Sequence, residues 1–139
     1  LDMADRLGPR VIVAPMASGL EAAIGVVRTE FGPVVSVGAG GTLIELSDDR
    51  CHLLAPVTSG EVRRAMSDLG LTARLRSVQG ADSAGETALY DAVSRVSIAV
   101  TAMPAIAELD VNPVLISAHG VVAVDALVGT TSVVHQVTS

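Results

Sequence analysis

The sequence contains no lysine and no tryptophan, and its only cysteine is Cys51. Phe31 and Tyr90 are its only aromatic residues. One cysteine excludes an internal disulfide and the usual cysteine-based zinc sites. A nucleic-acid-binding surface needs a basic stripe and often stacking aromatic residues. The net charge is -6 and the nine cationic residues are scattered arginines, so we exclude nucleic-acid binding.

Long apolar runs are also lacking. No stretch approaches the roughly 20 residues that a membrane-spanning helix needs. The first ten residues carry two aspartates and two arginines, which is not the pattern of a signal peptide. We therefore expect a soluble, cytoplasmic protein with no membrane partner. Because phosphate groups are so often held by lysine, a phosphate-binding role would need an ammonium group from elsewhere.

The chain is instead rich in hydrophobic residues. Half of its 139 residues are hydrophobic, mostly Ala, Val, Leu and Ile. A chain of this length buries one ordinary core, built here from small and branched side chains. We predict a single domain over residues 1–139.

Short apolar runs separated by turn-forming residues fill the first part of the chain. They predict strands over 11–16, 21–28, 34–37, 42–46 and 50–55. The connections are too short for parallel crossovers, so we expect an antiparallel meander. The glycine-rich segment 38–41 invites comparison with a phosphate-binding loop, but a strand follows it instead of a helix. A tight turn is the favoured interpretation.

The apolar period changes after Pro56. Thr58 and Glu61 form a capping-box pattern that opens a helix ending at Gly70. Ser83 and Glu86 form a second such pattern before a longer apolar stripe at helical spacing. Strands return over 106–111, 114–117 and 121–126, with a turn at 118–120. The pattern as a whole predicts an α+β fold, with helices packed on an antiparallel sheet.

The strongest chemical signal lies in the last predicted hairpin. Strand alternation places Glu108, Asp110 and Asn112 on one face, and the following strand ends in Asp125. Mg²⁺ takes oxygen ligands, usually one or two carboxylates together with substrate phosphates and water. These oxygen-bearing side chains are therefore suited to binding Mg-ATP. The alternative is that these polar side chains form the solvent-exposed face of an edge hairpin, and that Asn112-Pro113 serves only to form a turn.

Several segments occur together in an order typical of one family. They are VIVAPM at 11–16, GLEAAIG at 19–25, FGPVV to GGTLIE over 31–45, LAPV at 54–57 and AELDVNP at 107–113. Over about residues 11–128 the chain resembles the C-terminal lobe of the ATP-grasp domain of NDP-forming acyl-CoA synthetases. This group includes the ADP-forming acetate–CoA ligases and is related to succinyl-CoA synthetase.

The resemblance implies an enzyme that interconverts ATP, a carboxylic acid and CoA with ADP, phosphate and acyl-CoA. The implied route passes through an acyl phosphate and a phosphohistidine, and the implied ligands are Mg²⁺ and ATP or ADP. Asn112 and Asp125 match the positions expected to bind the metal, with Asp110 as a second-rank ligand.

The resemblance also implies an adenine-binding hinge near the start of the chain. Val13, Ala14 and Met16 would offer backbone groups to the base, and Glu21 would be a nearby polar contact. Ala14 replaces a frequent Gln or Glu, and Ser77-Val78-Gln79-Gly80 replaces a Gly-x-Arg-Gly step. Both departures remove a side chain that the family commonly has.

The lysine-bearing ATP-grasp lobe, the CoA-binding module and the module with the swinging histidine have no counterpart in the sequence. We therefore expect a fragment or one subunit, with these CoA-ligase modules as partners, no catalytic residue of its own and no activity alone. Two functional hypotheses follow: a lobe of a working acyl-CoA synthetase, or a ligand-sensing regulatory module, for example one fused to a protein acetyltransferase. A third alternative is a degenerate lobe that serves only as a structural interface.

The remaining reactive side chains have no pattern of their own. His52, His119 and His135 lack metal-ligand spacing, and Cys51 is expected to be a small buried side chain in a strand. Glu45 is expected at a solvent face or a lobe interface. We assign none of them a catalytic role.

Overall fold

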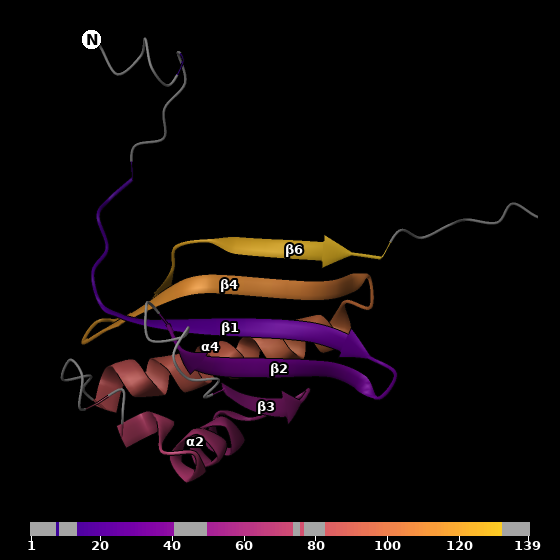
Figure 1. The fold of residues 1–139 in the computed structure, drawn as a ribbon, viewed down its shortest axis with the longest axis horizontal. Coiled ribbons are helices and arrows are strands. Elements are labelled where there is room, and N and C mark those ends of the chain that lie inside the picture. Colours follow the sequence, from indigo (N-terminus) through magenta and orange to yellow (C-terminus); the bar gives the residue numbers. More distant parts are fainter. Residues whose placement is uncertain (1–7, 9–13, 41–49, 74–75, 77–82, 132–139) are drawn as a thin grey trace, which may run out of the picture.

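The computed structural model describes residues 8, 14–40, 50–73, 76 and 83–131. The described strands form one sheet in the order β3-β2-β1-β4-β5, and β6 pairs with β4 alongside β5. Every pairing is antiparallel. Helices α2 and α4 cover one face of this sheet (Figure 1). The predicted α+β architecture is confirmed. The elements are β1 (Leu20–Thr29), β2 (Gly32–Ala39), β3 (Arg50–Leu54), α2 (Ser59–Asp68), α4 (Ser83–Ala102), β4 (Ile106–Ser117), β5 (Gly120–Ala123) and β6 (Ala126–Thr130).

The core lies between the sheet and the two helices. It is built from aliphatic side chains that alternate along the strands and recur along the helices, as the composition predicts. In this layer the strands contribute Ile24, Val26, Val35, Val37, Cys51, Val111, Val114 and Ile116, and the helices Val62, Met66, Leu89, Val93 and Val100. No described helix has the length and apolar character needed to cross a membrane.

A β-bulge interrupts β4 at Asn112-Pro113. Ala22 pairs with Val114 and Ile24 with Val111, so two residues of β4 oppose the single residue between them on β1. Proline lacks the N–H that a sheet ladder needs, which is why such a residue occurs at bulges. The extra residue reverses the alternation, so Val111 and Val114 both face the core. The two predicted strands 106–111 and 114–117 are therefore one bent strand.

Helix α2 begins and ends as its sequence predicts. The Glu61 N–H donates to the Thr58 hydroxyl at 3.3 Å, and the Glu61 carboxylate accepts the Thr58 N–H at 2.8 Å. These reciprocal bonds complete the predicted capping box. Past the helix end, Gly70 takes a φ of +69°, a conformation that favours glycine.

Helix α4 is held by polar contacts that its apolar stripe did not predict. Ser97 is fully buried, and its hydroxyl accepts the Val57 N–H at 3.0 Å. The Ser97 and Ser94 hydroxyls are also within hydrogen-bond distance of the Val57 carbonyl, at 3.2 and 2.8 Å. Glu86, placed in a second capping box by the sequence pattern, is buried and accepts two hydrogen bonds from Arg76. The side chain of Ser83 lies outside the described set.

Three strand predictions differ from the structure. Residues 14–16, part of the strand expected over 11–16, lie outside the strands because none of the described strands pairs with them. Strand β2 runs on to Ala39 through the segment expected to turn, since Gly38 and Ala39 still pair with β1. The strand expected over 121–126 ends at Ala123, and the unpredicted β6 begins at Ala126. The strand expected over 42–46 lies outside the described residues.

Candidate functional site

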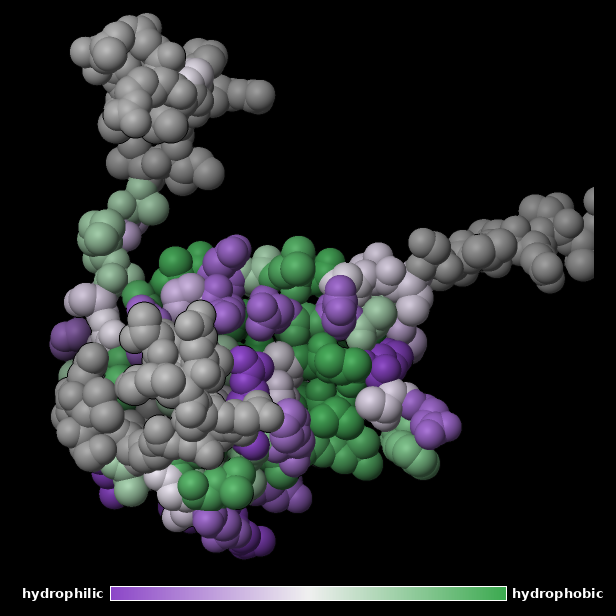
Figure 2. All heavy atoms as spheres, in the orientation of Figure 1, coloured by the Kyte–Doolittle hydropathy of each residue, from purple (hydrophilic) through white to green (hydrophobic). Residues whose placement is uncertain are grey.

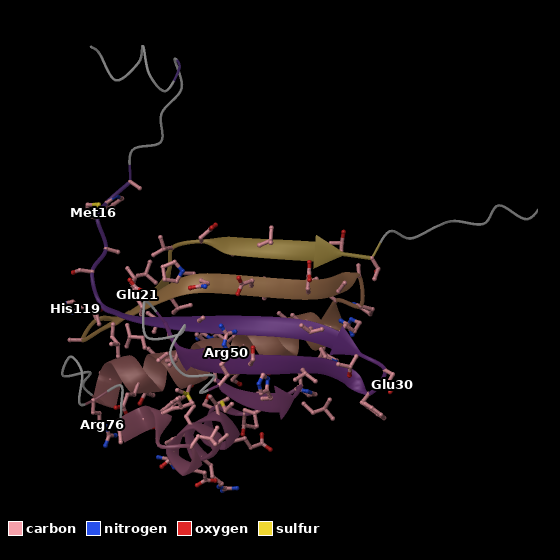
Figure 3. All side chains as sticks on the ribbon, viewed as in Figure 1. Met16, Glu21, Glu30, Arg50, Arg76 and His119 are labelled. Carbon is pink, nitrogen blue, oxygen red and sulfur yellow. The ribbon has the colours of Figure 1, made fainter. Side chains whose placement is uncertain are left out.

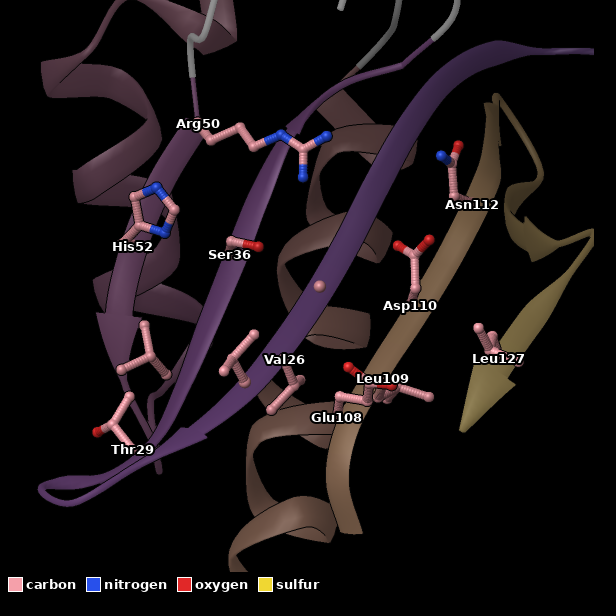
Figure 4. A pocket seen from close by; sticks show the side chains of 13 residues that line it. Val26, Thr29, Ser36, Arg50, His52, Glu108, Leu109, Asp110, Asn112 and Leu127 are labelled. Carbon is pink, nitrogen blue, oxygen red and sulfur yellow. The ribbon is translucent and has the colours of Figure 1, made fainter. Parts of the chain in front are cut away.

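The face of the sheet opposite the helices carries an open pocket of about 580 Å³. Figure 2 shows hydrophilic and hydrophobic side chains mixed on the side of the molecule viewed there. The pocket crosses five strands, from β3 through β2, β1 and β4 to β6 (Figure 4). Its polar lining residues are Thr29, Ser36, Arg50, His52, Glu108, Asp110 and Asn112.

One row of paired residues forms the floor of this pocket. His52 pairs with Ser36, Ser36 with Gly25, and Gly25 with Asp110. Leu127 pairs with Asp110 at the far end of the row. A Cβ atom at Gly25 would stand 2.7 Å from the Ser36 hydroxyl oxygen, so the middle of the floor is bare backbone. The row therefore separates a basic end on β3 from an acidic end on β4.

The acidic end comes from strand alternation in the first half of β4. Glu108, Asp110 and Asn112 are all exposed and line the pocket, whereas Val111 between them is buried. The predicted common face of these three side chains is confirmed. Figure 4 shows Asp110 and Asn112 along the same side of β4.

Asp125 lies opposite Asn112, in the link between β5 and β6. The Asn112 N–H donates to the Asp125 carbonyl at 3.2 Å, and the Val124 N–H donates to the Pro113 carbonyl at 3.0 Å. The Asp125 carboxylate accepts the Ala126 N–H at 2.8 Å, which fixes its side chain beside the link. The predicted position of Asp125 at a strand end is wrong, because β5 stops two residues earlier. The backbone nevertheless brings the two residues side by side.

The oxygen atoms in this corner suit a hard cation. Asn112 supplies an amide oxygen, Asp125 and Asp110 supply carboxylates, and all three residues are exposed. Within the described residues, no group of three or more His, Cys, Asp or Glu side chains could hold a metal ion. A dedicated protein cage is thus not found there. Mg²⁺ requires less, because one or two carboxylates with phosphate and water complete its shell.

Two of the predicted hinge residues, Ala14 and Met16, precede β1 in the chain. Ala14 and Met16 occupy an extended segment outside the sheet, and Met16 is 98% exposed. Figure 3 shows Met16 on the segment leading away from Glu21, which is exposed at the beginning of β1. The Glu21 carbonyl accepts the Gly40 N–H at 2.6 Å. Val13 lies outside the described residues.

Sequence reasoning missed the basic end of the pocket. Arg50 and His52 lie on β3 with buried Cys51 between them, so both side chains face the pocket. Figure 4 shows the Arg50 side chain extending from β3 across β2. The Arg50 side chain has no hydrogen bond or ion pair with any described residue, whereas its backbone pairs with Gly38 in the sheet. The alternation of Arg50-Cys51-His52 about a buried cysteine was the available signal.

The other candidates lie away from this pocket or outside the described set. Burial raises the pKa of the Cys51 thiol, as expected for a core side chain and not for a nucleophile. His119 is exposed in the β4–β5 turn (Figure 3). Glu45, His135 and the segment 77–80 are outside the described residues. On the helix side, the Glu86 carboxylate raises the pKa of Arg76 through its hydrogen bonds.

A family model described as an ATP-grasp domain matches residues 4–129. The chain therefore belongs to the ATP-grasp domain family. The order of motifs noted in the sequence and the antiparallel sheet with helices on one face agree with this assignment.

The relatives that this chain matches are acyl-CoA-forming ligases. The β subunit of acetate–CoA ligase (ADP-forming) I of Pyrococcus furiosus is 28% identical over 117 residues, which are 84% of this chain and 50% of that protein. The 4-hydroxybutyrate–CoA ligase (ADP-forming) of Nitrosopumilus maritimus is 33% identical over 111 residues, covering 79% of this chain and 16% of that protein. This chain thus spans half or less of the length of these relatives.

A solved structure of similar fold carries a nucleotide. It is the dinucleotide-forming acetyl-coenzyme A synthetase 1 of Ca. Korarchaeum cryptofilum, in complex with coenzyme A and Mg-AMPPCP. Its TM-score is 0.70 at 30% identity, over 85% of this chain and 55% of that chain. A structure from Pyrococcus horikoshii has a TM-score of 0.73 at 27% identity, covering 84% of this chain and 51% of that chain.

Proposed function

We propose that this chain is the Mg-nucleotide-binding lobe of an ADP-forming acyl-CoA synthetase. In the proposed reaction, ATP, a carboxylic acid and CoA yield ADP, phosphate and acyl-CoA through an acyl phosphate and a phosphohistidine. The relatives are ligases of this type, and one similar structure was determined with Mg-AMPPCP. The CoA site, the histidine and the lysine-bearing lobe are expected on partner modules.

One observation carries the proposal: Asn112 lines an open pocket and lies opposite Asp125 through a backbone hydrogen bond, with Asp110 two residues away on the strand of Asn112. The β-bulge at Asn112-Pro113 gives the strand its bend there, and bulges often re-aim a side chain beside an active site. Asn112 and Asp125 are assigned as metal ligands and Asp110 as a second-rank ligand.

The chain's own residues bind and orient the nucleotide in this scheme. When bound, Mg²⁺ offsets the negative charge of the phosphate oxygens. The segment around Val13, Ala14 and Met16 is assigned to the adenine, and Glu21 to a polar contact with the nucleoside. The carboxylates of Asp110 and Glu108 attract a cation to the acidic end of the pocket and repel a phosphate group that carries no metal ion.

The proposal is tested in the full-length protein that contains this chain. Asn112→Ala and Asp125→Ala are each expected to lower ATP-driven protein phosphorylation at limiting Mg²⁺ by at least about a hundredfold. Circular dichroism should show an unchanged fold, since both side chains are exposed. His119→Ala, in the turn between β4 and β5, is the control and should stay within a few-fold of the unmodified rate. Wild-type rates in both ligand variants would refute the metal site.

A further inference from the structure

We propose that Arg50 binds the terminal phosphate group of the metal-bound nucleotide, acting from the strand opposite the metal ligands. The inference rests on the proposed function and adds a residue that neither the family resemblance nor the relatives' names assign. It starts from an arginine that lines the pocket and whose side chain has no hydrogen bond or ion pair with any described residue, in a chain without lysine.

The first step is the distribution of charge across the pocket. Among its described lining residues, Arg50 is the permanent cation, and Glu108 and Asp110 are the carboxylates. Strands β2 and β1 separate the strand of Arg50 from the strand of Asp110. Three strand-to-strand steps span about 14 Å, at roughly 4.8 Å each. A direct ion pair between Arg50 and these two carboxylates is therefore not expected, so none of the described carboxylates of the pocket neutralises the guanidinium group.

The second step is the space in the pocket between its basic end on β3 and its acidic end on β4. Figure 4 shows the Arg50 side chain extending from β3 across β2. On β1, the next strand, Gly25 has no side chain and leaves that part of the pocket floor bare. The pocket volume of about 580 Å³ accommodates a metal ion and a phosphate chain in that interval. A phosphate chain that meets the metal at Asn112 and Asp125 would extend over Gly25 and end near the guanidinium group. His52 and Ser36 line the same path.

The third step is chemical fit. A guanidinium group presents paired N–H donors that match two phosphate oxygens and keeps its charge at every physiological pH. Carboxylates on β4 attract the metal, whereas Arg50 on β3 attracts the anion, so the pocket is polarised along its length. A ligand with a cation at one end and extra negative charge at the other is favoured over a nucleoside alone.

The test measures binding in the full-length protein with Mg-ATP, Mg-ADP and adenosine as probes. Arg50→Gln should weaken Mg-ATP binding about tenfold, the cost of one charge-assisted hydrogen bond. Mg-ADP should be affected less, and adenosine should bind unchanged. Arg50→Lys should recover part of the loss because the charge remains. Arg95→Gln, exposed on α4 away from the pocket, is the matched control and should bind all three probes normally.

Asn112→Ala, measured alongside, separates this inference from the proposed function. If Arg50→Gln weakens Mg-ATP binding and spares adenosine, the phosphate role stands whatever Asn112→Ala does. If Asn112→Ala loses Mg²⁺-dependent binding while Arg50→Gln binds as the unmodified protein does, the Arg50 inference is overturned and the metal site stands. An equal loss of adenosine and Mg-ATP in Arg50→Gln would also overturn it, because the residue would then shape the pocket instead of contacting phosphate.

Discussion

Arg28 links the sheet to the end of the long helix through three backbone carbonyls. Its Nε donates to Ile106 at 2.9 Å, and its Nη2 donates to Val100 at 2.7 Å and Met103 at 3.2 Å. The last turn of a helix has carbonyls without helical partners, and a cation there is also favoured by the helix dipole. Helix α4 has no basic residue in its own last turn, so β1 supplies one.

We predict that Arg28→Met lowers the free energy of unfolding by about 1–3 kcal/mol, because partly buried carbonyls lose a charged donor. Urea unfolding followed by circular dichroism measures the change. The control is Arg95→Met on the exposed side of α4, expected within about 0.5 kcal/mol of the unmodified chain. Equal stability of the two variants would show that solvent satisfies these carbonyls as well as Arg28 does.

At the scale of helices and strands, sequence patterns predicted the features that depend on residues close together in the chain. The Thr58–Glu61 box and Gly70 bound α2 as expected, because each acts within one helical turn. The pattern did not reveal β6, since Ala126-Leu127-Val128-Gly129-Thr130 becomes a strand only by pairing with the first half of β4. It also split β4 at Pro113, because a proline stops a strand or forms a bulge according to its neighbouring strand.

The capping box also predicts a pH dependence of stability. Hydrogen bonds from the Thr58 N–H, and next from its hydroxyl, lower the pKa of Glu61 below its usual 4.5. A lowered folded-state pKa stabilises the fold above the unfolded value, and that contribution is lost as pH falls through the folded value. Thr58→Ala should cost about 1 kcal/mol at pH 7. The cost should shrink below the folded pKa of Glu61, where the carboxylate is protonated.

Urea unfolding at pH 7 and at acidic pH measures this difference. Ser67→Ala, on the exposed side of the same helix, provides the comparison and should show a small change that does not vary with pH. A penalty for Thr58→Ala that is identical at both pH values would mean that the Thr58 hydroxyl adds nothing to the lowering of the Glu61 pKa, because the Thr58 N–H, which lowers that pKa most, is kept in the variant.

At the scale of the whole molecule, the sequence predicted the acidic half of the site better than the basic half. Alternation placed Glu108, Asp110 and Asn112 together because they share one strand. Arg50 lies three strands away from them, and no local pattern reports which strands lie side by side in a sheet. The hinge role of Ala14 and Met16 stays a prediction, because the described segment shows only that it is exposed.

The open form of the pocket leads to the last prediction. Ligand sites commonly bury 70–90% of a small ligand's surface, whereas this pocket lies on one face of a single sheet and has no opposing wall among its described lining residues. A nucleotide resting there keeps one side in water, where each charge contact is worth little. We expect the isolated chain to bind Mg-ATP with a Kd weaker than ~1 µM, about 8 kcal/mol of binding free energy.

Titration calorimetry of the isolated chain against the full-length protein tests this, and the full-length protein should bind more tightly because both walls contact the ligand. Purified chain mixed with ATP, a carboxylic acid and CoA should form no acyl-CoA above background, since our proposal assigns the phosphate-binding lysines and the CoA site to partner modules. Binding tighter than ~1 µM by the isolated chain would show that one sheet face is a complete site. Acyl-CoA formation by it would contradict the division of the enzyme into separate lobes.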